Sequence, residues 1–289
     1  MIPAQFDYHA PKTLPEALAL LGQLGDEAKV LSGGQSLLPL LKLRFAQPVH
    51  LVDIGRIPGL DYIKEEGGFL RIGALVRESA LETSPLIASK YPILADTAAV
   101  IADPIVRNLA TVCGNLAHGD PANDHPATML ALGAELVATG AKGPRTIPIA
   151  QFFTGLFTTA LQPNEVLTEI RIPVPPPGSG GAYLKLERKV GDFATAGVAA
   201  FLVLKGGVIE RAGIGITNAG PTPIKAEAAE KSLLGKKADA AAFAEAARLA
   251  AAATRPNPDR RGSTEYKQEM ARVLSIRALG KAAQRAGGK

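Results

Sequence analysis

The run PVPPPGSGG, at residues 173 to 181, limits the folds open to this chain more than any other segment. Proline lacks a backbone N–H and has a fixed φ, and glycine loses the most conformational freedom on ordering, so no regular element is expected to cross this run. The chain has 289 residues, which exceeds one typical domain. We therefore expect one domain over 1–175 and a second over 178–289.

The amino-terminal domain is expected to contain two α/β lobes, at about 1–58 and 59–175. In the first lobe, Thr13 and Glu16 have the capping-box spacing ahead of a short amphipathic segment, 14–24, which predicts a helix. A β, glycine-turn, α, β unit follows. Its parts in chain order are a strand at 28–31, the turn SGGQS, an apolar helix that begins LLPLLKLR and a strand at 49–54.

Helices and strands are mixed in the rest of the chain, which favours the α+β class. The second lobe is expected to contain strands at 69–74 and 166–172, a helix at 92–102, and a helix that leads into a strand over 127–140. In the last domain, strands are predicted at 182–188, 196–207 and 208–217. Alanine-rich helices are then predicted behind Thr222, Asp239 and Ser263 as N-caps.

Composition excludes several classes of protein. No run of about 18 uncharged apolar residues exists that could span a bilayer, and the amino end shows no signal peptide, so a cytoplasmic protein is expected. One cysteine cannot form an internal disulfide, a Cys-rich zinc site or an iron–sulphur cluster by itself. The net charge of +5 is spread along the chain, which argues against a nucleic-acid partner.

The turn SGGQS, residues 32 to 36, follows a predicted strand and opens a predicted helix. Free N–H groups and the positive end of a helix can hold an anion at such a place. The sequence is neither a Walker A motif nor the spaced glycine motif of a Rossmann turn. Taken alone, it is equally compatible with a plain strand-to-helix turn.

The stretch TVCGNLAHGDPANDHP, residues 111 to 126, allows three interpretations. Two prolines and irregular spacing match no compact metal motif, and a nucleophilic Cys113 would need a nearby base and a lowered pKa. The third interpretation is a polar loop that offers N–H groups, an amide and a carboxylate to a ligand. The metal interpretation would join His118, Asp120, Asp124 and His125.

The two segments together resemble a known family. SGGQS and TVCGN, with DPANDHP after the second, are similar to the A-G-G-x-S and T-I-G-G-N loops of the FAD-binding medium subunits of molybdenum hydroxylases. Within that family the resemblance is greatest to the aerobic carbon monoxide dehydrogenase branch. The similarity runs nearly end to end and includes GDPANDHPA, EIRIPVP, YLKLERKVGDFATA and GITNAGPTP.

The resemblance implies an FAD-binding fold of the vanillyl-alcohol oxidase/p-cresol methylhydroxylase type, with two amino-terminal α/β lobes. A carboxy-terminal α+β domain, with a three-stranded sheet and a helical bundle, would cover the flavin. Residues 32–36 and 111–115 would hold the pyrophosphate, and Asp124 would lie near a sugar or the ribityl chain. No catalytic acid or base and no metal ligand is implied. The implied cofactor-binding residues are Ser32, Gly33, Gly34, Gln35, Ser36, Thr111, Val112, Cys113, Gly114, Asn115, Asp124, Lys185 and Phe193.

Lys185 would lie near the isoalloxazine, where a cation stabilises the reduced ring, and Phe193 would lie where relatives often carry Tyr or Trp. Without the resemblance, a solvated strand lysine and a core phenylalanine would be the simpler interpretations. Two residues depart from the family pattern. Ser32 replaces Ala in a loop that accepts small donors. Cys113 replaces a Gly whose position would suit a positive φ, which leaves the geometry of the second loop open, and we expect the loop still to bind FAD.

The resemblance also implies an electron-transfer role. Electrons from a molybdopterin cofactor in a large subunit would pass through the [2Fe-2S] clusters of a small subunit to this FAD, and then to a quinone, NAD or dioxygen. The complex would be a dimer of heterotrimers, with peripheral contact to a membrane electron acceptor at the inner face. The alternatives are a self-contained flavin oxidoreductase that acts on a small molecule, and a scaffold whose glycines only form turns.

Overall fold

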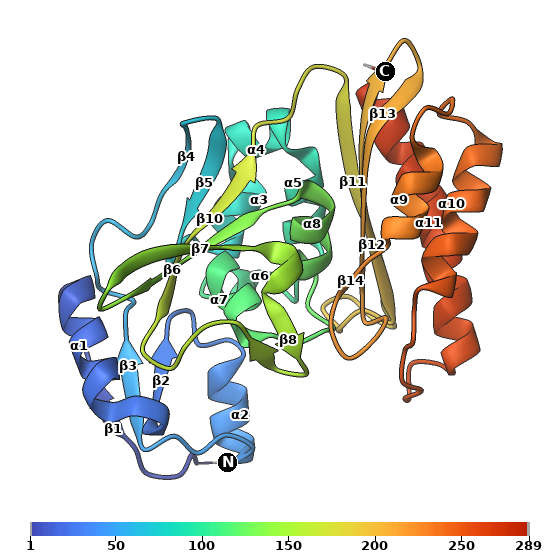
Figure 1. Ribbon diagram of the computed structural model, residues 1–289. Coiled ribbons are helices and arrows are strands. Elements are labelled where there is room, and N and C mark those ends of the chain that lie inside the picture. The colour runs from blue at the N-terminus through green and yellow to red at the C-terminus, as the bar shows by residue number, and fades with distance from the viewer. Residues whose placement is uncertain (1, 288–289) are drawn as a thin grey trace.

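The computed structural model describes residues 2–287, and in them the sheets follow one another along the chain (Figure 1). The first sheet has the order β1-β3-β2, and all its pairs are parallel. Thr13 caps α1 as expected, because its side chain accepts from Glu16 N at 3.3 Å. The elements of this lobe are β1 Asp7–His9, α1 Leu14–Leu24, the 3-10 helix Gly25–Glu27, β2 Ala28–Leu31, α2 Leu37–Leu43 and β3 His50–Asp53.

The second sheet is antiparallel and has the order β4-β5-β10-β6-β7. Helices α5 and α8 lie between it and the carboxy-terminal sheet (Figure 1). The strands are β4 Ile63–Glu66, β5 Phe69–Gly73, β6 Glu135–Gly140, β7 Gly143–Pro148 and β10 Val166–Pro173, with the small pair β8 Phe153–Gly155 and β9 Thr158–Thr159. The helices are α3 Glu78–Thr83, α4 Pro85–Lys90, α5 Pro92–Ala99, α6 Pro104–Arg107, α7 Val112–His118, α8 His125–Leu132 and the 3-10 helix Ile149–Gln151.

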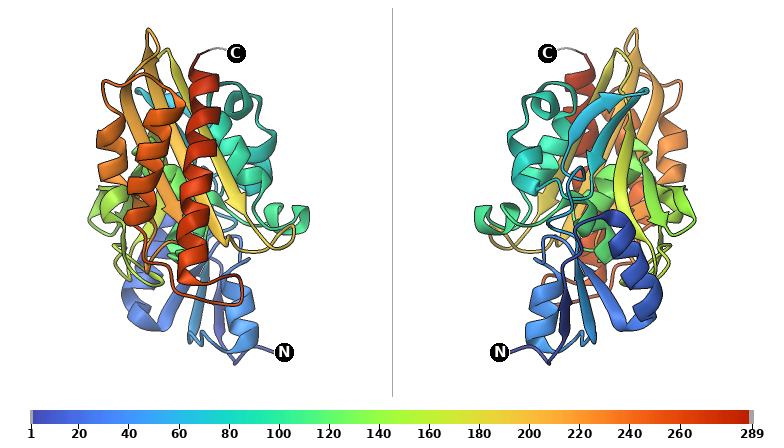
Figure 2. Two further views of the ribbon diagram at one scale, coloured as in Figure 1. Left: turned by 90° about the vertical axis from the view of Figure 1, so that its right-hand side faces the viewer. Right: turned by 90° about the vertical axis from the view of Figure 1, so that its left-hand side faces the viewer.

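The last sheet is antiparallel, with three long strands and one short strand in the order β11-β12-β13-β14. Helices α9, α10 and α11 cover its outer face, as Figure 2 shows most clearly in its left view. The elements are β11 Ser179–Leu186, β12 Ala196–Lys205, β13 Val208–Thr217, β14 Ile224–Lys225, α9 Glu227–Leu233, α10 Ala240–Ala252 and α11 Thr264–Ala286.

Strand β12 reads as a continuous apolar run because both of its faces are buried. Ala199, Phe201 and Val203 join the core that includes helix α8 and the second sheet. Ala200 and Leu202, on the other face, join the core beneath the outer helices. Every residue of α8 is buried, so this helix links the amino-terminal part of the chain to the last sheet.

Several expectations need correction. No element crosses the proline-rich run, but β11 begins inside it, at Ser179. Thr222 caps no helix, since β14 follows it and α9 begins behind Ala226, which makes no side-chain cap bond. The segment TVCGN is not a loop: Thr111 is an N-cap, and the residues after it form the first turns of α7.

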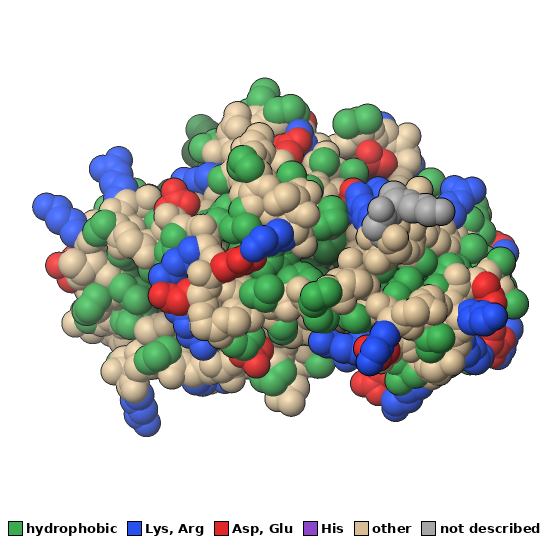
Figure 3. Space-filling model, turned by 90° about the horizontal axis from the view of Figure 1, so that it is seen from above, with side chains coloured by type: hydrophobic (Ala, Val, Ile, Leu, Met, Phe, Trp, Pro, Cys, Tyr) green, Lys and Arg blue, Asp and Glu red, His purple; other side chains and the backbone are tan. Residues whose placement is uncertain are grey.

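The surface carries charges of both signs. On the face drawn in Figure 3, Lys and Arg side chains are interspersed with Asp and Glu and with hydrophobic groups. Within the described residues, no helix is both long enough and apolar enough to cross a membrane.

Candidate functional site

The two glycine-containing segments meet in the fold. Ser32 Oγ lies 3.1 Å from Thr111 Oγ1, although the residues are 79 positions apart. Gly33 packs against the backbone just before Thr111: a Cβ at Gly33 would clash with the Leu109 carbonyl oxygen and lie 2.8 Å from Ala110 Cα. Only glycine allows this approach, so the first segment is built to touch the second.

Two sets of contacts fix the second segment, one within its own helix and one to the chain that follows strand β5. The Thr111 side chain accepts from Gly114 N at 3.2 Å, and a Cβ on Gly114 would lie 2.5 Å from that hydroxyl oxygen. Val112 N donates to the Val76 carbonyl at 3.1 Å, which ties the segment to the end of the second sheet. The helix cap and the sheet together fix where the first N–H groups of α7 point.

The first segment turns through a glycine as well. Gly34 has a φ of +74°, which a residue with a side chain rarely adopts. The Gln35 side chain donates to the Gly33 carbonyl at 3.2 Å, and Ser36 occupies the cap position of α2 without a side-chain cap bond. The Ser36 hydroxyl therefore does not satisfy the amides at the start of α2.

Cys113 does not strain the second segment, which answers the question that the sequence left open. The residue has helical backbone within α7, and its thiol is buried, 3.7 Å from the Gly73 carbonyl oxygen and 3.9 Å from that of Ile72. Burial raises the pKa of the Cys113 thiol well above its usual range, and the nearby carboxylates of Glu169 and Glu78 add to this. A nucleophilic role needs the opposite shift.

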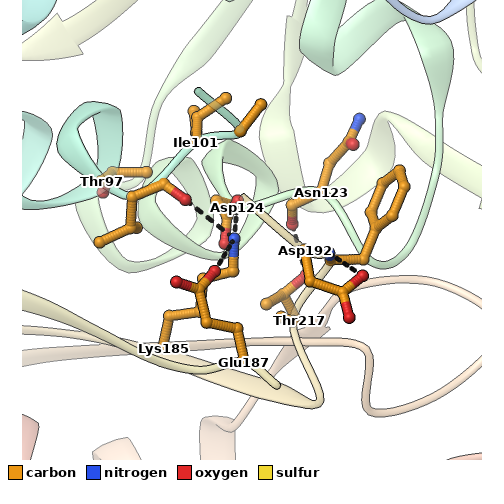
Figure 4. Close-up of polar contacts among 12 residues, drawn as sticks. Thr97, Ile101, Asn123, Asp124, Lys185, Glu187, Asp192 and Thr217 are labelled. Carbon is orange, nitrogen blue, oxygen red and sulfur yellow. Dashed lines mark hydrogen bonds and ion pairs between the residues drawn. The ribbon is translucent and has the colours of Figure 1, made fainter. Parts of the chain in front are cut away.

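Asp124 and Lys185 form a buried pair (Figure 4). Asp124 Oδ2 lies 3.1 Å from Lys185 Nζ, and Asp124 Oδ1 accepts from the Tyr183 hydroxyl at 2.5 Å. Lys185 Nζ also donates to the Val100 carbonyl at 2.9 Å and lies 3.3 Å from a carboxylate oxygen of Glu187. Burial raises the pKa of Asp124, while Lys185 and Tyr183 act to lower it. The Lys185 charge is thus offset within the protein.

Asn123 connects this pair to the second glycine segment. Asn123 directly precedes Asp124 in the sequence. Its side-chain amide donates to the Asn115 carbonyl at 2.8 Å. Within the described part of the chain, the buried Asn115 Oδ1 has no hydrogen-bond partner. A buried acceptor left unpaired costs about 1–3 kcal/mol, so a ligand that donates to Asn115 would be favoured here.

The metal interpretation is wrong for residues 2–287, where no group of three or more His, Cys, Asp or Glu side chains could hold an ion. The side chains that it would join have separate partners. His118 packs against Phe157 with ring centroids 5.3 Å apart, and His125 is hydrogen-bonded to Glu78 at 2.7 Å. The Asp120 carboxylate accepts from a backbone amide in its own turn.

Phe193 lies between β11 and β12 and is 49% exposed, so it is not a core residue. Asn218 links the backbone next to Phe193 to the rest of the site. Its side-chain amide donates to the Ala194 carbonyl at 2.7 Å, and its backbone N–H donates to the Pro121 carbonyl at 2.8 Å. The sequence did not single out Tyr183, Asn123 or Asn218. Asn218 lies in GITNAGPTP, one of the segments that resemble the family, but no local sequence pattern indicates which distant residues it contacts.

Comparison with known proteins assigns the family. Residues 4–175 match the model described as FAD binding domain in molybdopterin dehydrogenase, and 181–282 match the CO dehydrogenase flavoprotein C-terminal domain. The chain belongs to the FAD-binding family of molybdopterin dehydrogenases. This family binds FAD, and three features of the site fit that ligand. They are the contact of Gly33 with the second segment, the lack of space for a side chain at Gly114 and the unpaired Asn115 side-chain oxygen.

Carbon monoxide dehydrogenase medium chains are similar to this FAD-binding chain along nearly their whole length. It is 49% identical over 279 residues to the carbon monoxide dehydrogenase medium chain of Hydrogenophaga pseudoflava, which covers 96% of this chain and 97% of the relative. It is 48% identical to that of Afipia carboxidovorans, covering 99% of each. A solved carbon monoxide dehydrogenase from H. pseudoflava, which lacks the Mo-pyranopterin moiety of the molybdenum cofactor, aligns with a TM-score of 0.96 at 51% identity, covering 99% of each chain.

Proposed function

We propose that this chain is the FAD-carrying subunit of a carbon monoxide dehydrogenase-type molybdenum hydroxylase. It would take electrons from the [2Fe-2S] clusters of a partner subunit and pass them to an external acceptor. The observation that carries this proposal is the meeting of the two glycine segments at Ser32 and Thr111. Identity of about half over the full length of carbon monoxide dehydrogenase medium chains supports the substrate class.

Residues 32–36 and 111–115 would hold the diphosphate of FAD through backbone amides and small hydroxyls. Asp124 would accept a hydrogen bond from a sugar or ribityl hydroxyl. Among residues 2–287, each of its carboxylate oxygens has one side-chain donor, which leaves each a further lone pair for the ligand. Bound FAD supplies the electron-transfer chemistry, and the protein supplies its position and surroundings.

Lys185 and Phe193 would lie at the isoalloxazine end of the site. Lys185 Nζ donates to the Val100 carbonyl and to Asp124 and lies 3.3 Å from Glu187, so its first role would be to hold Asp124 in place. Asp124 and Glu187 would offset much of its positive charge, so only the remainder would act on the flavin. Phe193 would present an aromatic face at the exposed side of the ring.

Partner subunits are part of the proposal. The single cysteine is buried and cannot ligate a cluster, so the iron–sulphur centres would belong to a small subunit and molybdopterin to a large one. A dimer of such heterotrimers is the assembly that we propose. Within this chain, 1–175 would form the FAD-binding domain, with lobes at about 1–58 and 59–175, and 178–289 would cover the flavin.

Purification of the chain from its natural host, without denaturation, tests the proposal. We expect FAD, molybdenum and iron to co-purify with it, and carbon monoxide to bleach the flavin absorption of the complex. A purified single chain that turns over with an organic donor would instead favour a self-contained oxidoreductase. A chain that takes up no FAD on titration would favour a scaffold.

A further inference from the structure

Phe193 is exposed, yet the backbone on both sides of it is firmly held. The residue lies in the connection 187–195 between β11 and β12, where Val190 is 88% exposed. An exposed aromatic side chain on a free connection would sample many positions. Here the chain is fixed immediately before and immediately after Phe193, and each attachment reaches a different part of the molecule.

The attachment before Phe193 is the Asp192 carboxylate, which is 9% exposed. It accepts from Arg261 Nη2 at 2.6 Å, from Arg188 Nε at 2.9 Å and from the backbone N–H of Phe193 at 2.9 Å. These donors, the Arg261 guanidinium above all, hold the pKa of Asp192 far below its usual range. Charge-assisted bonds of this kind are among the stronger hydrogen bonds in proteins.

The attachment after Phe193 is Asn218, at the end of β13. Its side-chain amide donates to the carbonyls of Ala194 at 2.7 Å and Thr195 at 3.3 Å. Its own backbone N–H donates to Pro121 in the segment that leads to Asp124. Asn218 has a φ of +53°, a conformation that Asn tolerates better than most residues. Figure 4 shows that Thr217, the residue before Asn218, is hydrogen-bonded to the Asn123 carbonyl, next to Asp124.

Arg261 comes from a distant part of the chain. It lies 69 residues after Asp192, in the turn where Asp259 and Gly262 exchange backbone hydrogen bonds just before helix α11. Arg261 N donates to the Asp259 carboxylate at 2.7 Å, so the arginine itself is held by the turn. The connection between α10 and α11 thus reaches back to the exposed rim of the site.

We propose that Asp192 and Arg261 are positioning residues that fix Phe193 as an aromatic wall over the exposed side of the flavin. The wall restricts the access of water and small solutes to the ring. Because the backbone is held before the ligand arrives, binding FAD loses little further conformational freedom at this rim. The inference rests on the proposed function, since it requires FAD in this site.

The test uses the full chain loaded with FAD and variants of the pair. In R261Q and D192N we expect iodide to quench flavin fluorescence about threefold more effectively, and FAD to dissociate about fivefold faster. R260Q is the matched control, because Arg260 is the exposed neighbour of Arg261, and it should behave as the wild type. R261K keeps the charge and should restore part of the protection.

A double-mutant cycle separates positioning from general stability. If the pair acts through Phe193, F193A and R261Q each expose the flavin, and F193A/R261Q exposes it no further. Additive effects, or quenching unchanged in R261Q while thermal unfolding of the FAD-free chain shifts, would overturn the inference. FAD titration of the wild type comes first: a chain that binds FAD but shows those outcomes refutes only the wall, whereas no binding refutes the proposed function too.

Discussion

Gly33 is the residue at which the proposed FAD site tolerates a side chain least. In Gly33→Ala, the new Cβ meets the Leu109 carbonyl and Ala110 Cα, which are backbone atoms that cannot rotate away. The segments must separate, so we expect FAD affinity to fall by about tenfold or more, measured by titration of the FAD-free chain. The control is Gly22→Ala in α1, where a Cβ meets nothing within 4 Å, and it should leave affinity unchanged.

Cys113 gives a second prediction. Cys113→Gly removes a buried side chain and places glycine inside α7, so we expect the free energy of unfolding to fall by about 1–3 kcal/mol in urea. FAD affinity should not increase, because Cys113 already has helical backbone. Cys113→Ala keeps the β-carbon and should lose less stability. A gain in affinity of about tenfold in the glycine variant would show that the natural segment is strained after all.

Asp192 makes stability depend on pH on the acid side. Its pKa is lower in the folded chain than in the unfolded chain, so its stabilisation is complete above the usual carboxyl pKa and is lost as pH falls below about 4. We expect the difference in unfolding free energy between wild type and Asp192→Asn to be large at about pH 6 and to shrink at about pH 3. Urea unfolding of the FAD-free chains measures it, and a difference that does not vary with pH would contradict the argument.

At the scale of elements, the packing of α8 on β13 positions Asp124. Gly215 faces the backbone of α8, and a Cβ there would clash with the Ala127 carbonyl oxygen and lie 2.9 Å from Ala127 Cα. Gly215→Ala should therefore push α8 outward and shift Asp124 at its amino end. We expect a loss of stability of about 2 kcal/mol or more and weaker FAD binding. Gly280→Ala in α11, where a Cβ has open space, should not destabilise the chain.

The sequence predicted the elements whose signals are local. Strand β2 and strand β13 match their predicted ranges, and Asp239 and Ser263 cap their helices as expected. Short strands such as β1 and β4 were missed, because exposed residues dominate them and only pairing with a neighbour defines them.

The same limit applies to the candidate site. Both glycine segments could be found from their residue types, and the family resemblance paired them. The helical start of α7 at Thr111 was missed because glycine and asparagine there suggest a loop. Two partners of Lys185, Val100 and Asp124, lie far away in sequence, so a local pattern could show at most the nearby Glu187 and not the buried pair with Asp124.

At the scale of the whole molecule, Asp96 in α5 joins the amino-terminal part of the chain to the last helix. Its carboxylate accepts from Arg285 at 2.6 and 3.0 Å and from Lys281 at 3.1 and 3.2 Å, both in α11, and from Tyr183 N at 3.3 Å in β11. Arg285 also donates to the Gly181 carbonyl at 2.6 Å. The carboxylate therefore links three elements that are distant in sequence, and it holds β11, which carries Tyr183 and Lys185.

Removing one cation from this cluster should loosen α11 before the rest of the chain. Arg285→Ala leaves Asp96 with fewer donors in a partly buried setting, so we expect a loss of about 1–2 kcal/mol. Hydrogen exchange should show amides of α11 losing protection while those of β5 and β10 keep theirs. Arg272→Ala removes an exposed pair with Glu269 on the same helix and should leave the exchange pattern unchanged. If both variants lowered protection equally across the sheets, α11 would be held by its apolar face alone, and Asp96 would have no special part in joining the two halves of the molecule.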